Sequence, residues 1–381
     1  MRILLVQPDE EAGIGLQKFD RVEPLGLEMV AAALDDRHEV MLKDLRVERD
    51  VFASVLADFR PQVVGVSSVF TVGMLQTLSV AETARAACPD AFVTVGGHHP
   101  SLHPDDFRHP AVDAIVVGEG EVTMGELTDV LAAGGDPAEV AGLVLNLPQG
   151  QHFTGTRFLQ NLGALPQPRR SLTRSLRSHY HLFFRHPIAA VETTRGCPYR
   201  CDFCAVWRFY QKQVRFKSPQ KVVEELAEVE EPDILFTDDN FLAAIGRAGE
   251  TARLIQAHGI RKNYFIQARS DSIVRHPETI AAWQGVGLNG VFIGFEKPDQ
   301  EGLDELNKHN SVENNEKALE VLRRYGIEPF CSFIVDPGYG RDDFRALRSY
   351  IRRLKLGRPL FTVLTLRGTF IPIHAANRRY S

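Results

Sequence analysis

Three cysteines lie within eight residues, and their spacing is the clearest sign of chemistry in this chain. Residues 195–204 read Arg-Gly-Cys-Pro-Tyr-Arg-Cys-Asp-Phe-Cys, which places Cys197, Cys201 and Cys204 in a C-x3-C-x2-C pattern. Three thiolates on one short loop can bind three irons of a 4Fe–4S cluster and leave the fourth iron open to another ligand. A structural zinc site needs a fourth protein ligand, and none follows at zinc-finger spacing. Zinc and three unreactive cysteines are the alternatives.

The composition is that of an ordinary globular protein. The 381 residues allow two or three domains, and a content of 44% hydrophobic and 24% charged residues excludes a mostly disordered or fibrous chain. The net charge of −5 gives no electrostatic case for a nucleic-acid partner. Without a long apolar run or a signal-peptide pattern, we expect a cytoplasmic protein with no transmembrane segment. In such a compartment, clustered cysteines indicate a metal or catalytic site rather than a disulfide scaffold.

The first part of the chain alternates strand-like and helix-like segments. We expect strands at 3–6, 39–42, 63–66, 92–95, 114–117 and 143–145, and helices at 24–34, 73–87 and 121–132. These repeats predict an α/β domain over residues 1–146 with a parallel, doubly wound (Rossmann-like) sheet. Ligands of such sheets bind beyond the carboxyl ends of the strands. Small or polar residues follow those ends: Ser67, Ser68, Gly96, Gly97, Gly118 and Gly120.

Residues 147–187 are a predicted interdomain linker, rich in proline, and the basic stretch from Arg169 to Arg177 is expected to be a solvated face. A second β-α series then begins, with strands expected at 188–193, 234–237, 264–267, 290–294, 330–335 and 360–364. Six such strands predict a partial (β/α)6 barrel of the TIM type over residues 188–381. Ser218 before Pro219 predicts a helix start, and a further helix is expected from Ser311 to near Gly326.

The cysteine loop resembles the signature of the radical S-adenosylmethionine (SAM) superfamily, including an aromatic residue before the last cysteine. The resemblance implies that the open iron binds SAM and that its cleavage produces a 5′-deoxyadenosyl radical. It also implies contacts at the strand ends: Phe203 near the adenine, Asp238 and Asp239 at the methionyl amino group, Arg269 beside Gln267 at the carboxylate, and Glu296 at the ribose. The alternatives are a helix N-cap for the two aspartates, a surface ion pair for Arg269 and a structural ion pair for Glu296.

The glycine-bearing loops of the first domain resemble cobalamin-binding domains that precede radical SAM barrels. The stretches 24–27, 64–68, 95–100 and 117–123 carry this resemblance, which implies cobalamin contacts from Ser67, Ser68, Gly96, Gly97, His98, Gly118, Glu119, Gly120 and Glu121. A degenerate, empty domain is the alternative. The cobalt-ligating motif D-x-H-x-x-G is absent, since residues 8–13 read Pro-Asp-Glu-Glu-Ala-Gly. We therefore expect cobalt without a histidine ligand, with His98 as the rival.

Nearly the whole chain resembles the cobalamin-dependent radical SAM methyltransferases and, within them, the hopanoid ring-A (C-3) methylase group. Residues 195–217, 236–242, 267–271, 314–317 and 333–337 carry the narrower likeness. It implies methylation of an unactivated sp3 carbon of a hopanoid lipid or other secondary metabolite, a small-molecule or lipid substrate, and an external one-electron reductant of the flavodoxin or ferredoxin type. The alternatives are a cyclase or rearranging enzyme with the same cofactors, or a truncated cofactor-binding protein without turnover, because the relatives continue differently after residue 365.

Overall fold

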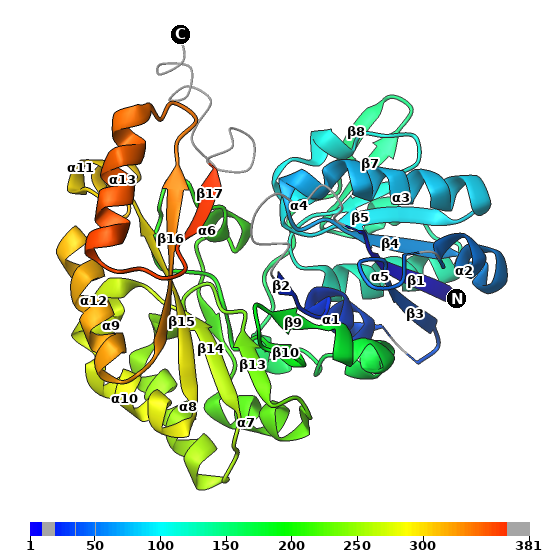
Figure 1. Cartoon of the computed structure of the whole chain (residues 1–381). Coiled ribbons are helices and arrows are strands. Elements are labelled where there is room, and N and C mark those ends of the chain that lie inside the picture. Colours follow the sequence, from blue (N-terminus) through cyan, green and yellow to red (C-terminus); the bar gives the residue numbers. More distant parts are fainter. Residues whose placement is uncertain (10–19, 35, 50, 364–381) are drawn as a thin grey trace. The chain divides into compact units, whose positions relative to one another are not determined.

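The computed structural model describes residues 1–9, 20–34, 36–49 and 51–363. They form two compact units, the first from Met1 to His181 and the second beginning at Leu182 (Figure 1). Most of the segment predicted as a linker, up to His181, therefore belongs to the first unit. In the described ranges, no helix has the length and apolar character needed to cross a membrane.

The first unit is built on a seven-stranded sheet. Its strands, in spatial order, are β3 (Glu39–Asp44), β1 (Arg2–Gln7), β4 (Val63–Ser67), β5 (Phe92–Gly96), β6 (Ala114–Val116), β7 (Leu143–Leu147) and β8 (Gly150–Phe153). The strands from β3 to β6 pair in parallel, as predicted, whereas β7 and β8 run antiparallel to their neighbours. A two-residue turn joins β7 to β8, which allows only antiparallel pairing because a parallel crossover needs a dozen or more residues.

Helices cover both faces of this sheet. They are α1 (Leu25–Ala33), α2 (Phe52–Phe59), α3 (Met74–Ala87), α4 (His98–Leu102) and α5 (Gly120–Ala132), and the two-residue strands β2 (Asp20–Arg21) and β9 (His181–Leu182) lie outside the sheet. Leu4 and Val6 pack with residues of α2 and α3, whereas Ile3 and Leu5 pack with residues of α1 and α5. Since side chains alternate between the faces of a strand, this is the predicted doubly wound arrangement.

The basic stretch predicted as a solvated face is folded against the first unit. It forms the 3-10 helix η6 (Arg170–His179), in which Arg170 and Arg177 pair with Glu23 at 2.5 and 2.8 Å, and Arg177 pairs with Glu28 at 2.9 Å. Both glutamate side chains are fully buried. The prediction is wrong because a run of charge does not reveal that buried carboxylates elsewhere in the chain need cationic partners.

The second unit is a half-barrel of six parallel strands. In spatial order they are β10 (Ile188–Val191), β13 (Asp233–Phe236), β14 (Asn263–Gln267), β15 (Leu288–Glu296), β16 (Glu328–Val335) and β17 (Leu360–Val363). Each strand pairs in parallel with the next, which confirms the predicted partial barrel; residue 364 lies outside the described ranges.

Helices and two short strands complete this unit. They are β11 (Thr194–Arg195), α6 (Val206–Phe209), β12 (Arg215–Phe216), α7 (Pro219–Glu228), α8 (Ile245–Ala257), α9 (Ser270–Arg275), α10 (Pro277–Val286), α11 (Gln300–Glu305), α12 (Val312–Arg324) and α13 (Arg341–Arg353). The side chain of Ser218 caps α7 and that of Ser311 caps α12, which confirms both predicted helix starts.

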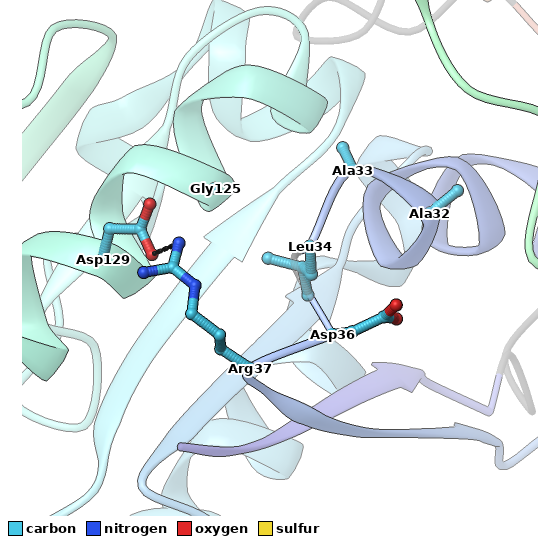
Figure 2. A pocket seen from close by; sticks show the side chains of 7 residues that line it. All are labelled: Ala32, Ala33, Leu34, Asp36, Arg37, Gly125 and Asp129. Atoms are coloured by element: carbon cyan, nitrogen blue, oxygen red, sulfur yellow. Dashed lines mark hydrogen bonds and ion pairs between the residues drawn. The ribbon is translucent and has the colours of Figure 1, made fainter.

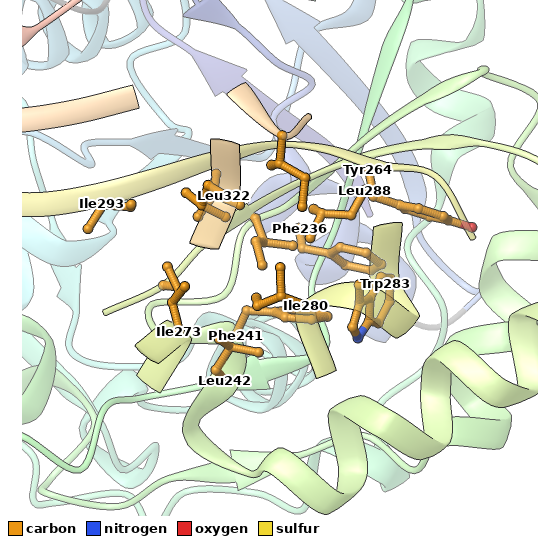
Figure 3. Close-up of a cluster of buried hydrophobic side chains, with 14 of the residues drawn as sticks. Phe236, Phe241, Leu242, Tyr264, Ile273, Ile280, Trp283, Leu288, Ile293 and Leu322 are labelled. Carbon is orange, nitrogen blue, oxygen red and sulfur yellow. The ribbon is translucent and has the colours of Figure 1, made fainter. Parts of the chain in front are cut away.

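An aromatic cluster fills the layer between the strands and helices of the second unit (Figure 3). Trp283 of α10 is fully buried and meets Phe236, Phe241 and Tyr264 edge-on, with ring centroids 5.6, 4.8 and 5.5 Å away. Its indole N–H donates to the carbonyl of Ala248 in α8 at 3.0 Å. The side chain of Trp283 thus links strands β13 and β14 to helices α8 and α10 and helps to fix the two strands in place.

Replacing Trp283 by alanine should destabilise the second unit by about 3–5 kcal/mol, because it leaves a large cavity in a closely packed core. Phe344→Ala is the control, since that ring is half exposed and should cost less than about 1 kcal/mol. Urea unfolding of the iron-free protein, followed by far-ultraviolet circular dichroism, measures both. Equal losses in the two variants would contradict the role given to this cluster.

Candidate functional site

The three cysteines lie on a loop closed at its base by β11 and β12. These strands pair antiparallel, so the chain leaves and returns at one point beyond the carboxyl end of β10. Gly196 has a φ of +92°, and a Cβ there would lie 2.2 Å from the carbonyl oxygen of Gln213, so only glycine fits. Cys197, Cys201 and Cys204 follow at the end of the first half-barrel strand, which is where a β/α barrel carries functional residues.

Burial governs the chemistry of the three thiols. It raises the pKa of each, for Cys204 to about 12, and neighbouring cysteines raise the pKa of Cys197 and Cys204 further. The protons therefore stay on sulfur until a metal displaces them. In the described part of the chain, no group of three or more His, Cys, Asp or Glu side chains is arranged to hold a single metal ion. In a cluster each cysteine binds a different iron, so the three thiols need not converge on one point.

Asp238 and Asp239, which follow β13, hold the segment that leads into the cysteines. The fully buried Asp238 accepts the N–H groups of Thr193 (2.6 Å) and Thr194 (3.0 Å) and the hydroxyl of Thr193. Asp239 accepts the N–H of Gly196 at 2.9 Å. Burial raises the pKa of both carboxyl groups, for Asp239 to about 6. Neither side chain caps a helix, so the N-cap alternative does not describe them.

Asn240 completes this strand end, and sequence reasoning did not single it out. Its side chain is almost fully buried, and its amide nitrogen lies 3.9 Å from Sγ of Cys197. Its Oδ1 is buried without a hydrogen-bond partner among the described residues. A buried acceptor in that condition suits a ligand that brings a donor, because leaving it unpaired costs free energy. The Asp-Asp-Asn run after a predicted strand was the available signal.

The end of β14 carries a buried arginine. Arg269 is 6% exposed, so it is no surface ion pair, and its guanidinium donates to Asp271 and to the backbone carbonyls of Lys308 and His309. Gln267, the last residue of β14, is half-buried, and no described residue forms a hydrogen bond with its side chain. The two predicted residues are therefore differently placed: the arginine is engaged within the chain, and the glutamine is not.

Glu296 ends β15 beside a shift in strand register and has a φ of +63°. It is buried and pairs with Nζ of Lys308 at 2.7 Å, which is the ion pair considered as its alternative role. Lys308 also lies 5.5 Å from the ring centroid of Phe203, which packs with Leu306 and Ile334. Phe203, Arg269 and Glu296 thus meet around the segment that carries Lys308, a residue the sequence did not single out.

In the first unit, the ends of β4 and β5 approach each other closely. The N–H of Ser68, directly after Ser67, donates to the carbonyl of Gly96 at 2.7 Å. Gly97 has a φ of +119°, and a Cβ there would lie 2.5 Å from the carbonyl oxygen of Ser68. The hydroxyl of Ser68 is buried and has no hydrogen-bond partner within the described ranges. Glycine is therefore required at position 97. The buried hydroxyl of Ser68 is suited to a hydrogen bond with a ligand at the carboxyl ends of these strands.

Strand β6 pairs in parallel with β5, so its carboxyl end lies at the same edge, and the chain then enters α5. Gly118 has a φ of +81°, Glu119 is the N-cap residue, Gly120 is the first residue of α5, and Glu121 is buried in its first turn. His98 is half-buried at the start of α4. All these predicted residues therefore follow parallel strands at one edge of the sheet. Residues 10–13, where a histidine motif is missing from the sequence, lie outside the described ranges.

A hollow of about 520 Å³ lies elsewhere on the first unit, where α1 ends and the chain enters β3 (Figure 2). Arg37 and Asp129 form an ion pair of 3.1 Å at its rim. It adjoins the amino end of a strand rather than a carboxyl end, and none of the predicted site residues lines it. It is therefore separate from the candidate site.

Two family models match the chain in the regions of the two sites. Residues 19–128 match the B12 binding domain, and residues 191–351 match the radical SAM superfamily. The chain is 34% identical over 337 residues to the hopanoid C-3 methylase of Methylococcus capsulatus, an alignment that covers 87% of this chain and 64% of that protein. It is 28% identical over 382 residues to an uncharacterised methyltransferase of Pyrococcus horikoshii, covering 96% and 81%.

The fold is also similar to that of a solved structure. TsrM from Kitasatospora setae, a radical SAM methyltransferase solved with cobalamin and a [4Fe-4S] cluster bound, superposes with a TM-score of 0.77 at 22% identity. The match covers 99% of this chain and 75% of that one. At this identity the similarity concerns the fold: a parallel α/β unit followed by a six-stranded half-barrel.

Replacing Asp238 by alanine should cost about 2–5 kcal/mol and impair iron binding, because two buried N–H groups beside the cysteine loop lose their acceptor. Asp238→Asn is the matched control: it retains an oxygen for both N–H groups and should lose less. Urea unfolding of the iron-free protein and iron content after reconstitution measure the two effects. Normal stability and iron content in Asp238→Ala would show that the carboxylate does not hold the loop.

Proposed function

The chain belongs to the family that joins a B12-binding domain to a radical SAM domain, and we propose that it is a cobalamin-dependent radical SAM methyltransferase acting on an unactivated sp3 carbon. The observation that carries the proposal is the position of the three-cysteine loop, beyond the carboxyl end of the first strand of a parallel half-barrel. An α/β unit with a glycine-lined sheet edge precedes it in the same chain.

Cys197, Cys201 and Cys204 would hold three irons of a 4Fe–4S cluster. Their arrangement suits this group: the thiols share one short loop, their pKa values respond to one another, and the loop is anchored through buried carboxylates. When bound, the cluster supplies the electron that cleaves SAM to a 5′-deoxyadenosyl radical. Cys201 is buried and Cys197 and Cys204 are half-buried, and a reactive radical requires a site from which water is excluded.

The strand ends of the half-barrel would bind SAM. Asn240 would supply a buried acceptor that has no partner in the described part of the chain, and Asp239 a carboxylate, for the methionyl ammonium. Glu296, paired with Lys308, would accept from the ribose hydroxyls, and Phe203 would lie against the adenine. Binding an ammonium would also favour the ionised form of Asp239, whose pKa burial raises to about 6.

Cobalamin would bind at the carboxyl edge of the first sheet. A Cβ at Gly118 would meet no atom within 4 Å, so backbone is open to a bulky ligand there, and the hydroxyl of Ser68, which has no partner among the described residues, offers such a ligand a hydrogen bond. Gly96, Gly118 and the loop before α5 lie along the same edge. When bound, cobalamin supplies the methyl group that is transferred.

The proposed substrate is a hopanoid or other lipid-like secondary metabolite. This rests on the 34% identity to a hopanoid methylase, of which the chain spans 64%. The reductant would be a one-electron donor of the flavodoxin or ferredoxin class in the cytoplasm, because a low-potential cluster needs a reducing supply. The mass of the product separates methylation from cyclisation or rearrangement with the same cofactors.

Anaerobic reconstitution should load about four irons and four sulfides per chain. Replacing Cys197, Cys201 and Cys204 together by alanine should abolish loading, because it removes all three proposed iron ligands. Cys88→Ala and Cys331→Ala are the controls and should load normally, since both thiols lie in the apolar clusters of the two units. A full cluster in the triple variant would refute the central assignment.

With reductant, cobalamin and SAM, the reconstituted protein should form 5′-deoxyadenosine. With a hopanoid it should also form S-adenosylhomocysteine and a product heavier by one methylene group, since SAM serves both as radical source and as methyl source. Mass spectrometry measures all three, and the triple cysteine variant is the control. A product of unchanged skeleton mass would favour rearrangement, and absence of 5′-deoxyadenosine from fully loaded protein would refute the proposal.

A further inference from the structure

The guanidinium of Arg269 is occupied on its edges by groups of its own chain. Nε donates to Oδ1 of Asp271 at 3.0 Å, and Nη2 donates to the carbonyls of Lys308 and His309, both at 2.9 Å. Nη1 points at Sγ of Cys201, 3.9 Å away. These four hydrogen bonds join the end of β14 to the cysteine loop and to the segment before α12.

The face of the same guanidinium is occupied as well. Its central carbon lies 3.5 Å from the ring centroid of Tyr199, a close cation–π stack. The hydroxyl of Tyr199 donates to Oδ2 of Asp271 at 3.1 Å, so Asp271 holds both the ring and the arginine. Tyr199 lies between Cys197 and Cys201 in the sequence. The side chains of Arg269, Tyr199 and Asp271 therefore hold the cysteine loop between its first and second cysteines.

A guanidinium stacked on one ring and bonded along its edges is poorly placed to form a new bidentate pair with a ligand carboxylate. We infer that Arg269 is a positioning residue for the iron–sulfur cluster, which fixes the cysteine loop and directs its positive charge at Cys201, rather than the partner of the SAM carboxylate. The inference rests on the proposed function, since it requires the cluster.

The expected consequence is electrostatic. Reduction adds a negative charge to the cluster, and hydrogen bonds to the sulfurs and nearby charge set its reduction potential. A buried cation with an N–H directed at a ligand sulfur stabilises the reduced form and so raises the potential. The effect is large because Arg269 is only 6% exposed and little screened by water.

The test compares Arg269→Gln with Arg275→Gln. Arg275 pairs with the same carboxylate, Oδ2 of Asp271 at 2.5 Å, but its side chain is 58% exposed. Each variant removes one positive charge from the same neighbourhood. After iron content is verified, redox titration by electron paramagnetic resonance without SAM should give a more negative midpoint for Arg269→Gln and little change for Arg275→Gln. Arg269→Lys keeps the charge but not the planar stack, and its midpoint should lie between those of wild type and Arg269→Gln.

SAM affinity, measured by equilibrium binding, separates the two roles. The inference expects affinity within about twofold of wild type in Arg269→Gln, whereas loss of a carboxylate partner would weaken it about tenfold or more. An unchanged midpoint with tenfold weaker SAM binding would overturn the inference. Loss of the cluster from a folded Arg269→Gln, but not from Arg275→Gln, would support the positioning role. A wild-type protein that binds no cluster would refute the proposed function instead.

Discussion

The candidate site of the second unit depends on holding three thiols, one buried and two half-buried, on one short loop. Burial raises their pKa values, so the loop gains nothing electrostatically until metal replaces the protons, and its shape must be set by other groups. Asp238 and Asp239 hold the segment before the first cysteine through hydrogen bonds. Arg269 stacks on Tyr199 and so holds the loop between the first and second cysteines. These anchors come from the ends of β13 and β14, whose positions rest on the aromatic core around Trp283. A packed core thus supports a site that has little stability of its own.

The two units place their candidate site residues at equivalent positions in their sheets but use different kinds of residue. Each presents its candidate site residues where parallel strands end, the edge at which such sheets bind ligands. In the half-barrel that edge carries charged and sulfur-bearing side chains with dense hydrogen bonding. In the first unit it carries glycines and a serine hydroxyl that has no hydrogen-bond partner among the described residues. The first arrangement suits a small charged cofactor and a cluster, and the second suits a large macrocycle with hydrogen-bonding groups at its periphery.

Several site residues have partners that their sequence context did not indicate. Asp238 follows a strand end, a position typical of a ligand-binding carboxylate. Its Oδ1 instead accepts hydrogen bonds from the backbone N–H groups just before the cysteine loop. Arg269 was expected at a ligand carboxylate, and its donors are taken by groups 2 to 68 residues away along the chain. Asn240 and Lys308 were not singled out, although Asn240 has a buried oxygen without a partner among the described residues and Lys308 forms an ion pair with Glu296. Hydrogen-bond partners from distant segments are invisible to spacing and periodicity.

The sequence by itself determined the type of fold and predicted where the chemistry lies. Apolar runs of strand length separated by helical stretches specify parallel α/β units, and three cysteines on one loop are informative because their chemistry depends on local spacing alone. Only the tertiary structure decided which charges are buried and what pairs with them. The basic stretch of η6 illustrates this, since Arg170 and Arg177 pair with glutamates nearly 150 residues earlier in the chain. Local patterns report backbone periodicity, whereas the fate of a polar side chain depends on its desolvation and on partners that folding brings from elsewhere.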